Sequence, residues 1–292
     1  MQRRERVLGW SLVGPTLLLL VAFNVFPLLW NVVLSFTSAE LVGGEARFVG
    51  GAHYGRVFED PRFADALRRT ALFVLLAVSI ELALGFVLAL SLRRGFRGKQ
   101  VVLTTLLVPM MLSPAVMGLY GSLILNGNYG ILNQMLGGLG LAQPQWLSDR
   151  DLKFWSILLI DIWMWTPFMM LIALAGLSSI PSSIYEAAEI DRASTWRVFR
   201  RITLPMCAPV LGLAVLFRAT DALKQFDLVM AVSGPNDAAT QTLSTLLYQV
   251  VFRDGKVGLG AAFACILLVV VIALSTVFTR YVDRLQSKGV TE

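Results

Sequence analysis

Residues 183–205 read Ser-Ile-Tyr-Glu-Ala-Ala-Glu-Ile-Asp-Arg-Ala-Ser-Thr-Trp-Arg-Val-Phe-Arg-Arg-Ile-Thr-Leu-Pro, a polar stretch between two long apolar segments. A connection of about 25 residues is longer than a turn between packed helices requires, so it is expected to carry structure of its own. Ser183 and Glu186 have the spacing of a capping box just after Pro181, and Pro205 is expected to interrupt the helical pattern before the next apolar segment. The stretch therefore predicts two short helices.

The composition around this stretch is that of a membrane protein. Of the 292 residues, 56% are hydrophobic and only 15% are charged, and the mean hydropathy is +0.69. A span needs about 20 apolar residues to cross a hydrocarbon core and must be helical, because lipid offers backbone groups no other partner. We expect an all-α polytopic membrane protein with one transmembrane domain over residues 1–292. Its six expected transmembrane helices cover approximately residues 8–36, 67–92, 101–125, 152–178, 207–232 and 259–281.

Basic residues predict the orientation of these spans. Cytoplasmic loops carry an excess of Lys and Arg. Most basic residues near span ends would lie on one side: Arg3, Arg4, Arg6, Arg93, Arg94, Arg97, Lys99, the arginines between 192 and 201, Arg280, Arg284 and Lys288. Both termini and the loop 179–206 are therefore expected in the cytoplasm, with the first span kept as an uncleaved anchor. We attribute the net charge of +6 to the orientation of the spans and to contact with anionic lipid, rather than to nucleic-acid binding.

The loop resembles the EAA motif of binding-protein-dependent ABC importer permeases. It matches at Glu186-Ala187-Ala188 and at Ile202-Thr-Leu204-Pro205, whereas the glycine of the family pattern is replaced by Arg192. Other segments look like the carbohydrate-uptake branch, of the maltose- and glycerol-phosphate type: Gly14-Pro15 to Phe36, Asp60 to Phe63, Tyr129 to Asn133, Trp163 to Met170, Phe217 to Asp227 and Ser233 to Pro235. The resemblance covers nearly the whole chain.

This resemblance implies a type I importer permease fold with a cytoplasmic coupling loop over residues 179–206. It implies a multi-pass protein of a bacterial or archaeal plasma membrane that pairs with a second homologous permease. Two ATPases, which would bind ATP and Mg²⁺, and an external solute-binding protein would complete the transporter, and this chain would bind no cofactor itself. The solute would be a sugar or a related polyol or sugar phosphate.

By the same resemblance, contact with the ATPase falls on the residues that match the motif. They are Glu186, Ala187, Ala188, Asp191, Arg192, Phe199, Leu204 and Pro205, with Pro205 as a hinge into the fifth span. A glycine between two helices usually supplies a positive φ, which arginine adopts only at a cost. Arg192 therefore predicts either a reshaped turn or a long basic side chain that reaches an acidic group on the ATPase.

Ionisable residues inside spans are costly and often functional. The fifth span carries Arg218, Asp221, Lys224 and Asp227 at steps of three with alternating charge, so neighbours can pair along the helix. One interpretation is a polar solute path, for which the candidates are Asp221, Lys224, Asp227, Trp163 and Tyr120. The other is that such residues fix helix packing. For Arg218, a structural ion pair within or between helices is favoured. For Glu81 and Asp161 in neighbouring spans, pairing with a neighbouring helix is favoured over contact with solute.

Missing motifs narrow the function further. The sequence has no Gly-x-x-x-x-Gly-Lys-Ser/Thr motif for ATP, and its single histidine, His53, excludes a multi-histidine metal site within the chain. Cys207 and Cys265 fall at or within spans and are expected to be buried and reduced. Energy for transport must come from a partner ATPase or from an ion gradient. The alternative function is an ion-coupled carrier that uses Glu81, Asp161 and Asp221, although the internal repeats typical of such carriers are absent at the level of motifs.

Overall fold

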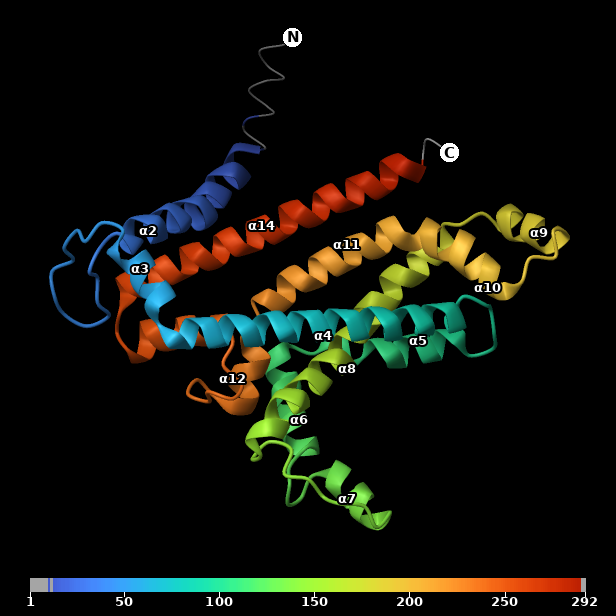
Figure 1. Ribbon diagram of the computed structural model, residues 1–292, viewed down its shortest axis with the longest axis horizontal. Coiled ribbons are helices and arrows are strands. Elements are labelled where there is room, and N and C mark those ends of the chain that lie inside the picture. The colour runs from blue at the N-terminus through green and yellow to red at the C-terminus, as the bar shows by residue number, and fades with distance from the viewer. Residues whose placement is uncertain (1–9, 11–12, 290–292) are drawn as a thin grey trace, which may run out of the picture. The chain divides into compact units, whose positions relative to one another are not determined.

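The computed structural model describes residue 10 and residues 13–289, with side chains up to Arg280. This part of the chain is almost entirely helical (Figure 1). Its one β-feature is an isolated antiparallel bridge between Thr37 and Phe48. Arg3, Arg4 and Arg6 of the predicted cytoplasmic N-terminus lie outside the described residues, as do the side chains of Arg284 and Lys288.

Within the described residues, five helices are long and apolar enough to cross a membrane. They are Val13–Leu34, α4 (Pro61–Leu92), α8 (Arg150–Ser178), Thr195–Leu223, and the Val257–Arg280 part of α14 (Val257–Gly289). A bent pair of helices gives a sixth if it is counted as one span. The chain is therefore an all-α polytopic membrane protein.

The expected third span, 101–125, is not one straight helix. The chain forms α5 (Lys99–Leu107), a short 3₁₀ turn η2 (Pro109–Met111) and α6 (Pro114–Ile124), and the two α-helices meet at an angle of 100°. Proline lacks an N–H and restricts the residue before it, so Pro109 and Pro114 end one helix and start another. Ser113 caps α6 by accepting a hydrogen bond from the Val116 N–H.

The expected fifth span, 207–232, is also broken. Helix α11 (Leu204–Leu223) ends before Lys224, and a separate helix, α12 (Asp227–Ser233), follows and ends at Gly234, whose φ is +71°. Between them the Gln225 side chain is buried, and it donates a hydrogen bond to Asp161. Of the four ionisable residues in this expected span, Lys224 and Asp227 therefore lie at a helix break, whereas Arg218 and Asp221 lie within α11.

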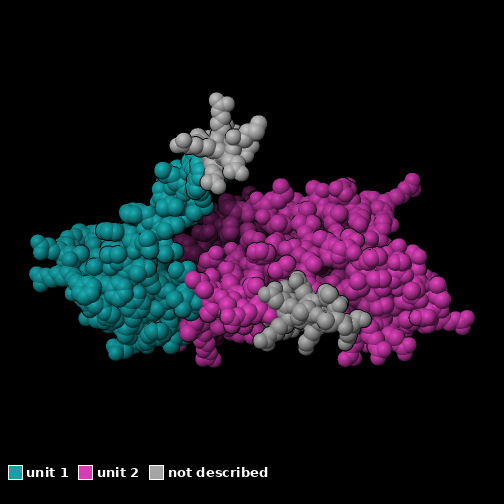
Figure 2. Space-filling view, turned by 90° about the horizontal axis from the view of Figure 1, so that it is seen from above, with its two compact units in different colours: residues 1–64, 246–270 teal, residues 65–245, 271–292 magenta. Residues whose placement is uncertain are grey.

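The chain divides into two compact units (Figure 2). Unit 1 comprises Met1–Ala64 and Leu246–Val270. It contains the π-helical turn η1 (Val21–Val25), α2 (Phe26–Ser35), α3 (Ala52–Glu59), the end of α13 (Leu243–Tyr248), the π-helical turn η4 (Gln249–Arg253) and the start of α14. Asn31 on α2 donates to the Ala261 carbonyl oxygen of α14 at 3.3 Å. Cys265 is only half-buried, so the expected burial is wrong for it and correct for Cys207.

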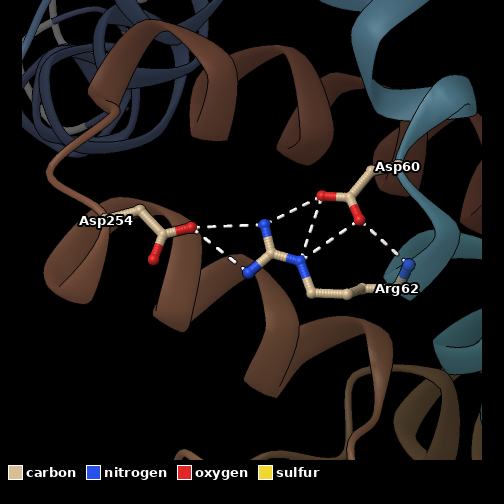
Figure 3. Close-up of polar contacts among 3 residues, drawn as sticks. All are labelled: Asp60, Arg62 and Asp254. Carbon is tan, nitrogen blue, oxygen red and sulfur yellow. Dashed lines mark hydrogen bonds and ion pairs between the residues drawn. The ribbon is translucent and has the colours of Figure 1, made fainter.

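Arg62 holds the start of α4 in unit 1 (Figure 3). Its guanidinium lies 2.8 Å from Asp60 and 3.2 Å from Asp254, which stands just before α14. The side-chain hydrogen bond from Arg62 keeps the pKa of Asp60 below its usual value. This contribution to stability is therefore present above the ordinary pKa of a carboxyl group and is lost as the pH falls through the lowered native value.

Replacing Arg62 with methionine is expected to cost less than about 1 kcal/mol of stability, because the pair is partly exposed. The loss should be local, with faster amide hydrogen exchange at residues 249–258 at neutral pH and a smaller difference in acid. Arg56→Met is the matched control, because Arg56 is exposed on α3 and forms no ion pair within the described residues. Equal exchange in wild type and Arg62→Met would contradict this role.

Unit 2 comprises Asp65–Thr245 and Val271–Glu292. Small residues let its helices approach closely. A side chain at Gly85 of α4 would lie 2.7 Å from Met169 and Met170 of α8, and one at Gly118 of α6 would lie 2.7 Å from Ala231 of α12. Gly121 of α6 packs in the same way against Ile160 of α8. These contacts bring α4, α6, α8 and α12 together around a shared apolar core.

Candidate functional site

The loop 179–206 forms one short helix and one helical extension of the next span. Helix α9 (Ser182–Ile190) is followed by a turn, by α10 (Thr195–Val198) and by the π-helical turn η3 (Phe199–Thr203), which runs directly into α11. The capping box expected at Ser183 and Glu186 does not form, because α9 starts right after Pro181 and places Ser183 inside its first turn. The second helix is capped instead by Ser194, which accepts from the Arg197 N–H.

Pro205 does not interrupt the helix as expected. The chain is helical without a break from Thr195 to Leu223 within the described residues. Proline has no N–H to donate, and the chain accommodates it with a wider π turn just before it, in which the Leu204 N–H bonds to the Phe199 carbonyl oxygen. Such π turns often occur at functional positions.

Arg192 adopts the conformation that the glycine of the motif would supply. Its φ is +49°, and it is the one non-glycine residue with a positive φ in the described part of the chain. The Ala193 N–H bonds to the Ala188 carbonyl oxygen at 2.9 Å, and the Arg192 N–H bonds to that of Glu189 at 3.0 Å. These two bonds define a Schellman motif at the end of α9. The reshaped turn considered from the sequence is therefore not found.

Replacing Arg192 with glycine is expected to stabilise this turn by about 1–2 kcal/mol, which is the cost of a left-handed conformation for a residue with a side chain. Amide hydrogen exchange at residues 188–194 should become slower. Ala193→Gly is the control, since it adds backbone freedom without relieving a positive φ. Faster exchange in Arg192→Gly would show that the arginine side chain stabilises the turn more than its backbone strains it.

Aromatic and polar contacts fix the loop against the end of α4. The Arg93 guanidinium lies over the Tyr185 ring, 3.8 Å from its centroid, and the Tyr185 hydroxyl hydrogen-bonds to that of Thr203 at 3.2 Å. Phe199 packs against Phe86 of α4 and stacks on Trp196. The loop is therefore packed against the end of α4 and against the π-helical turn that leads into α11.

The predicted contact residues divide into two groups. Ala188 is buried and Phe199 is half-buried, so both hold the loop together rather than offer a surface. The exposed members are Glu186, Ala187, Asp191, Arg192, Leu204 and Pro205. A groove of about 510 Å³ lies between α9 and the second helix, with Ala187 and Asp191 on one side and Arg197 and Arg201 on the other.

Two exposed apolar residues of the loop were not included in the predicted contact set. Ile190 at the end of α9 is 82% exposed, and Trp196 on α10 is 67% exposed. Large apolar side chains are normally withdrawn from water, so two of them in one short polar loop suggest a surface that another protein covers. Two large apolar residues within a charged stretch of sequence could have indicated this exposed surface.

A buried ion cluster joins three long helices of unit 2. Arg218 of α11 is 1% exposed, and it donates to both carboxylate oxygens of Glu81 on α4, at 2.8 and 3.0 Å. It also donates to Asp161 of α8, which accepts a further bond of 2.7 Å from Gln225. The pairing with a neighbouring helix favoured for Glu81 and Asp161 is therefore correct, and so is the structural ion pairing favoured for Arg218.

The candidate solute-path residues lie on different elements and are all exposed: Tyr120 on α6, Trp163 on α8, Asp221 on α11, Lys224 in the break and Asp227 at the start of α12. The pairing along the helix forms between Arg218 and Asp221, at 3.5 Å. No ion pair joins Lys224 to Asp227 among the described residues. Asp221 is thus the one candidate in contact with the buried cluster.

The chain belongs to the family of binding-protein-dependent transport system inner membrane components, whose model matches residues 81–288. It is 32% identical to the trehalose/maltose transport system permease protein MalF of Thermococcus litoralis over 95% of this chain and 94% of that protein. It is 33% identical to the sulfoquinovosyl glycerol transport system permease protein SmoG of Agrobacterium fabrum, over 95% and 91% of the two chains.

The fold also matches that of one chain of an importer of known structure. A crystal structure of a bacterial alginate ABC transporter, in complex with an alginate pentasaccharide-bound periplasmic protein, superposes with a TM-score of 0.85. The identity there is 20%, and 96% of each chain is covered. The chain is therefore a non-catalytic permease subunit of an ATP-driven importer in the inner membrane, which decides against the ion-coupled carrier.

Proposed function

We propose that this permease imports a sugar or a related polyol or sugar phosphate that an external solute-binding protein delivers. The relatives named for trehalose, maltose and sulfoquinovosyl glycerol transport support this solute class, because each matches nearly the whole chain. A second homologous permease and two ATPases complete the proposed transporter. ATP and Mg²⁺ bind to the ATPases, and this chain binds neither a cofactor nor nucleic acid.

The loop 179–206 is the proposed contact with the ATPase. The observation that carries this assignment is its surface, where Glu186, Ala187 and Asp191 are exposed beside the exposed Ile190. Small residues on α9 permit close approach, and the fixed contacts of Tyr185 and Phe199 transmit a displacement of α9 to α4 and α11. ATP binding then shifts access between the two sides because the ATPase contacts the two states with different affinity.

In the proposed orientation, this loop and both termini are cytoplasmic. Arg93 and Arg94 at the end of α4 and the arginines of the loop lie on the same side, as the positive-inside rule requires. Asp221 is the proposed solute contact, because it is exposed beside Arg218 and its carboxylate can accept hydrogen bonds from solute hydroxyls. Lys224, Asp227, Trp163 and Tyr120 stay in the proposal as further residues of the path.

Uptake by intact cells tests this function. Cells that lack the chain are expected to lose high-affinity uptake of one of a panel of solutes that includes trehalose, maltose and sulfoquinovosyl glycerol, and the wild-type chain should restore it. Uptake should persist when a protonophore collapses the ion gradient while ATP is maintained, and should stop when ATP is depleted. Loss of uptake with the protonophore alone would contradict the ATP-driven mechanism.

A further inference from the structure

Helix α7 (Ile131–Gly138) carries an apolar stripe that nothing in the described chain covers. Ile131, Met135 and the C-cap residue Leu139 follow one another at steps of four, which places them on one face of a helix. All three are exposed, Met135 by 61% and Leu139 by 75%. The opposite face carries Asn133, which is buried.

Hydrogen bonds hold this stripe outward. The Asn133 amide donates to the carbonyl oxygens of Gly127 and Pro144, both at 2.9 Å. The Trp146 indole N–H donates to the Asn133 side-chain oxygen at 2.8 Å, and Ser156 of α8 donates to the Trp146 carbonyl oxygen. Turning the stripe inward would break these bonds, so the orientation of the exposed face is fixed by the structure of the segment.

Exposed apolar side chains also lie on α6, the helix that precedes α7 in the chain. Leu119 and Leu123, again four residues apart, are exposed on α6, and Tyr129 is exposed between the two helices. Tyrosine is enriched where a protein meets the lipid headgroups. The apolar face of α7 is therefore contiguous in the chain with exposed side chains of the kind that contact lipid.

The absence of charged residues around the stripe indicates what covers it. From Gln100 to Ser148 the chain has no Asp, Glu, Lys, Arg or His. Soluble protein partners are steered and selected by complementary charges around an apolar patch, and this segment offers none. A neutral apolar face with an exposed tyrosine fits the boundary between lipid headgroups and acyl chains.

We propose that α7 is an interfacial anchor, with Ile131, Met135 and Leu139 inserted into the outer boundary of the bilayer. An amphipathic helix of this kind buries its apolar face by about 5–10 Å. Because Asn133 and Trp146 join α7 to the start of α8, the anchor fixes the depth of that end of α8 in the membrane. This inference rests on the membrane fold and on the proposed orientation, and not on the solute or the ATPase.

Site-directed fluorescence in vesicles tests the anchor. Single cysteines replace Met135 and Leu139 on the stripe, and Gln134 and Gly138, each one residue earlier, serve as matched controls that face about 100° away. Each position is exposed, so labelling with an environment-sensitive probe should leave the fold intact. The labelled chain is reconstituted in phosphatidylcholine vesicles, and the unsubstituted chain measures labelling at Cys265.

The expected result is a blue-shifted emission at residues 135 and 139, quenched by phosphatidylcholine with a nitroxide on its acyl chain and protected from aqueous iodide. Probes at 134 and 138 should show the reverse. Iodide quenching at all four positions, without quenching by the nitroxide lipid, would overturn the proposal. Protection of residues 135 and 139 only after a purified solute-binding protein is added would also overturn it and assign the stripe to a protein contact.

Discussion

Replacement of Arg218 with methionine is expected to destabilise the folded permease by about 3–5 kcal/mol, which is the cost of leaving a buried charge without its partner. Glu81 and Asp161 are both fully buried, and Arg218 is the cation that pairs with each of them. Because these residues lie on α4, α8 and α11, their loss should affect the assembly of the whole helix bundle. Thermal unfolding in detergent and the yield of monodisperse protein measure the effect.

Two variants separate this effect from a general loss of an arginine. Arg280→Met removes an exposed arginine of α14 and should leave the unfolding temperature nearly unchanged. The triple variant Glu81→Gln, Asp161→Asn, Arg218→Met removes all the buried charges together and should recover part of the lost stability. Wild-type stability in Arg218→Met would show that the cluster does not hold these helices together.

Reversing the charge of Glu186 is expected to separate ATP hydrolysis from transport. The Glu186 side chain is exposed and makes no hydrogen bond or ion pair within the described chain, so Glu186→Lys should insert and fold normally. Removing one partner of a desolvated charge pair at an interface costs about 2–5 kcal/mol, which would abolish most of the coupling if Glu186 meets a cation on the ATPase. Solute uptake and ATP hydrolysis are measured together in proteoliposomes that contain the complete transporter.

Glu189→Lys is the matched control for this prediction. It makes the same charge change on the same helix, but Glu189 lines a different hollow, beside Arg93 and Arg94. Its effect on coupling should be smaller. Unchanged solute uptake per ATP in Glu186→Lys would remove Glu186 from the coupling contact.

Sequence patterns located most of the membrane helices but not their breaks. Long apolar runs identify α8 and α14 because lipid leaves the backbone no alternative to a helix. Hydropathy did not show the break after Leu223, where the buried Gln225 side chain finds a partner in Asp161, 64 positions away. At Pro205 the sequence predicted a break that does not exist. A π turn just before this proline accommodates it, although proline usually ends a helix.

The ionisable residues illustrate the same limit. Because a charge inside a membrane is costly, Glu81, Asp161 and Arg218 were expected to have partners. The spacing along the fifth span identified only one partner for Arg218, the neighbouring Asp221. The strongest contacts of Arg218 are with residues 137 and 57 positions away. At Arg192 the missing glycine suggested a reshaped turn, whereas the chain keeps the left-handed conformation with an arginine in that position.

The most direct test of the proposed importer is gentle purification of the wild-type chain from its native membrane, followed by mass spectrometry of the proteins that accompany it. We expect an ATPase and a second, homologous permease to be recovered with this chain. Recovery of this chain alone, under conditions in which other transporter complexes from the same membrane stay intact, would contradict it.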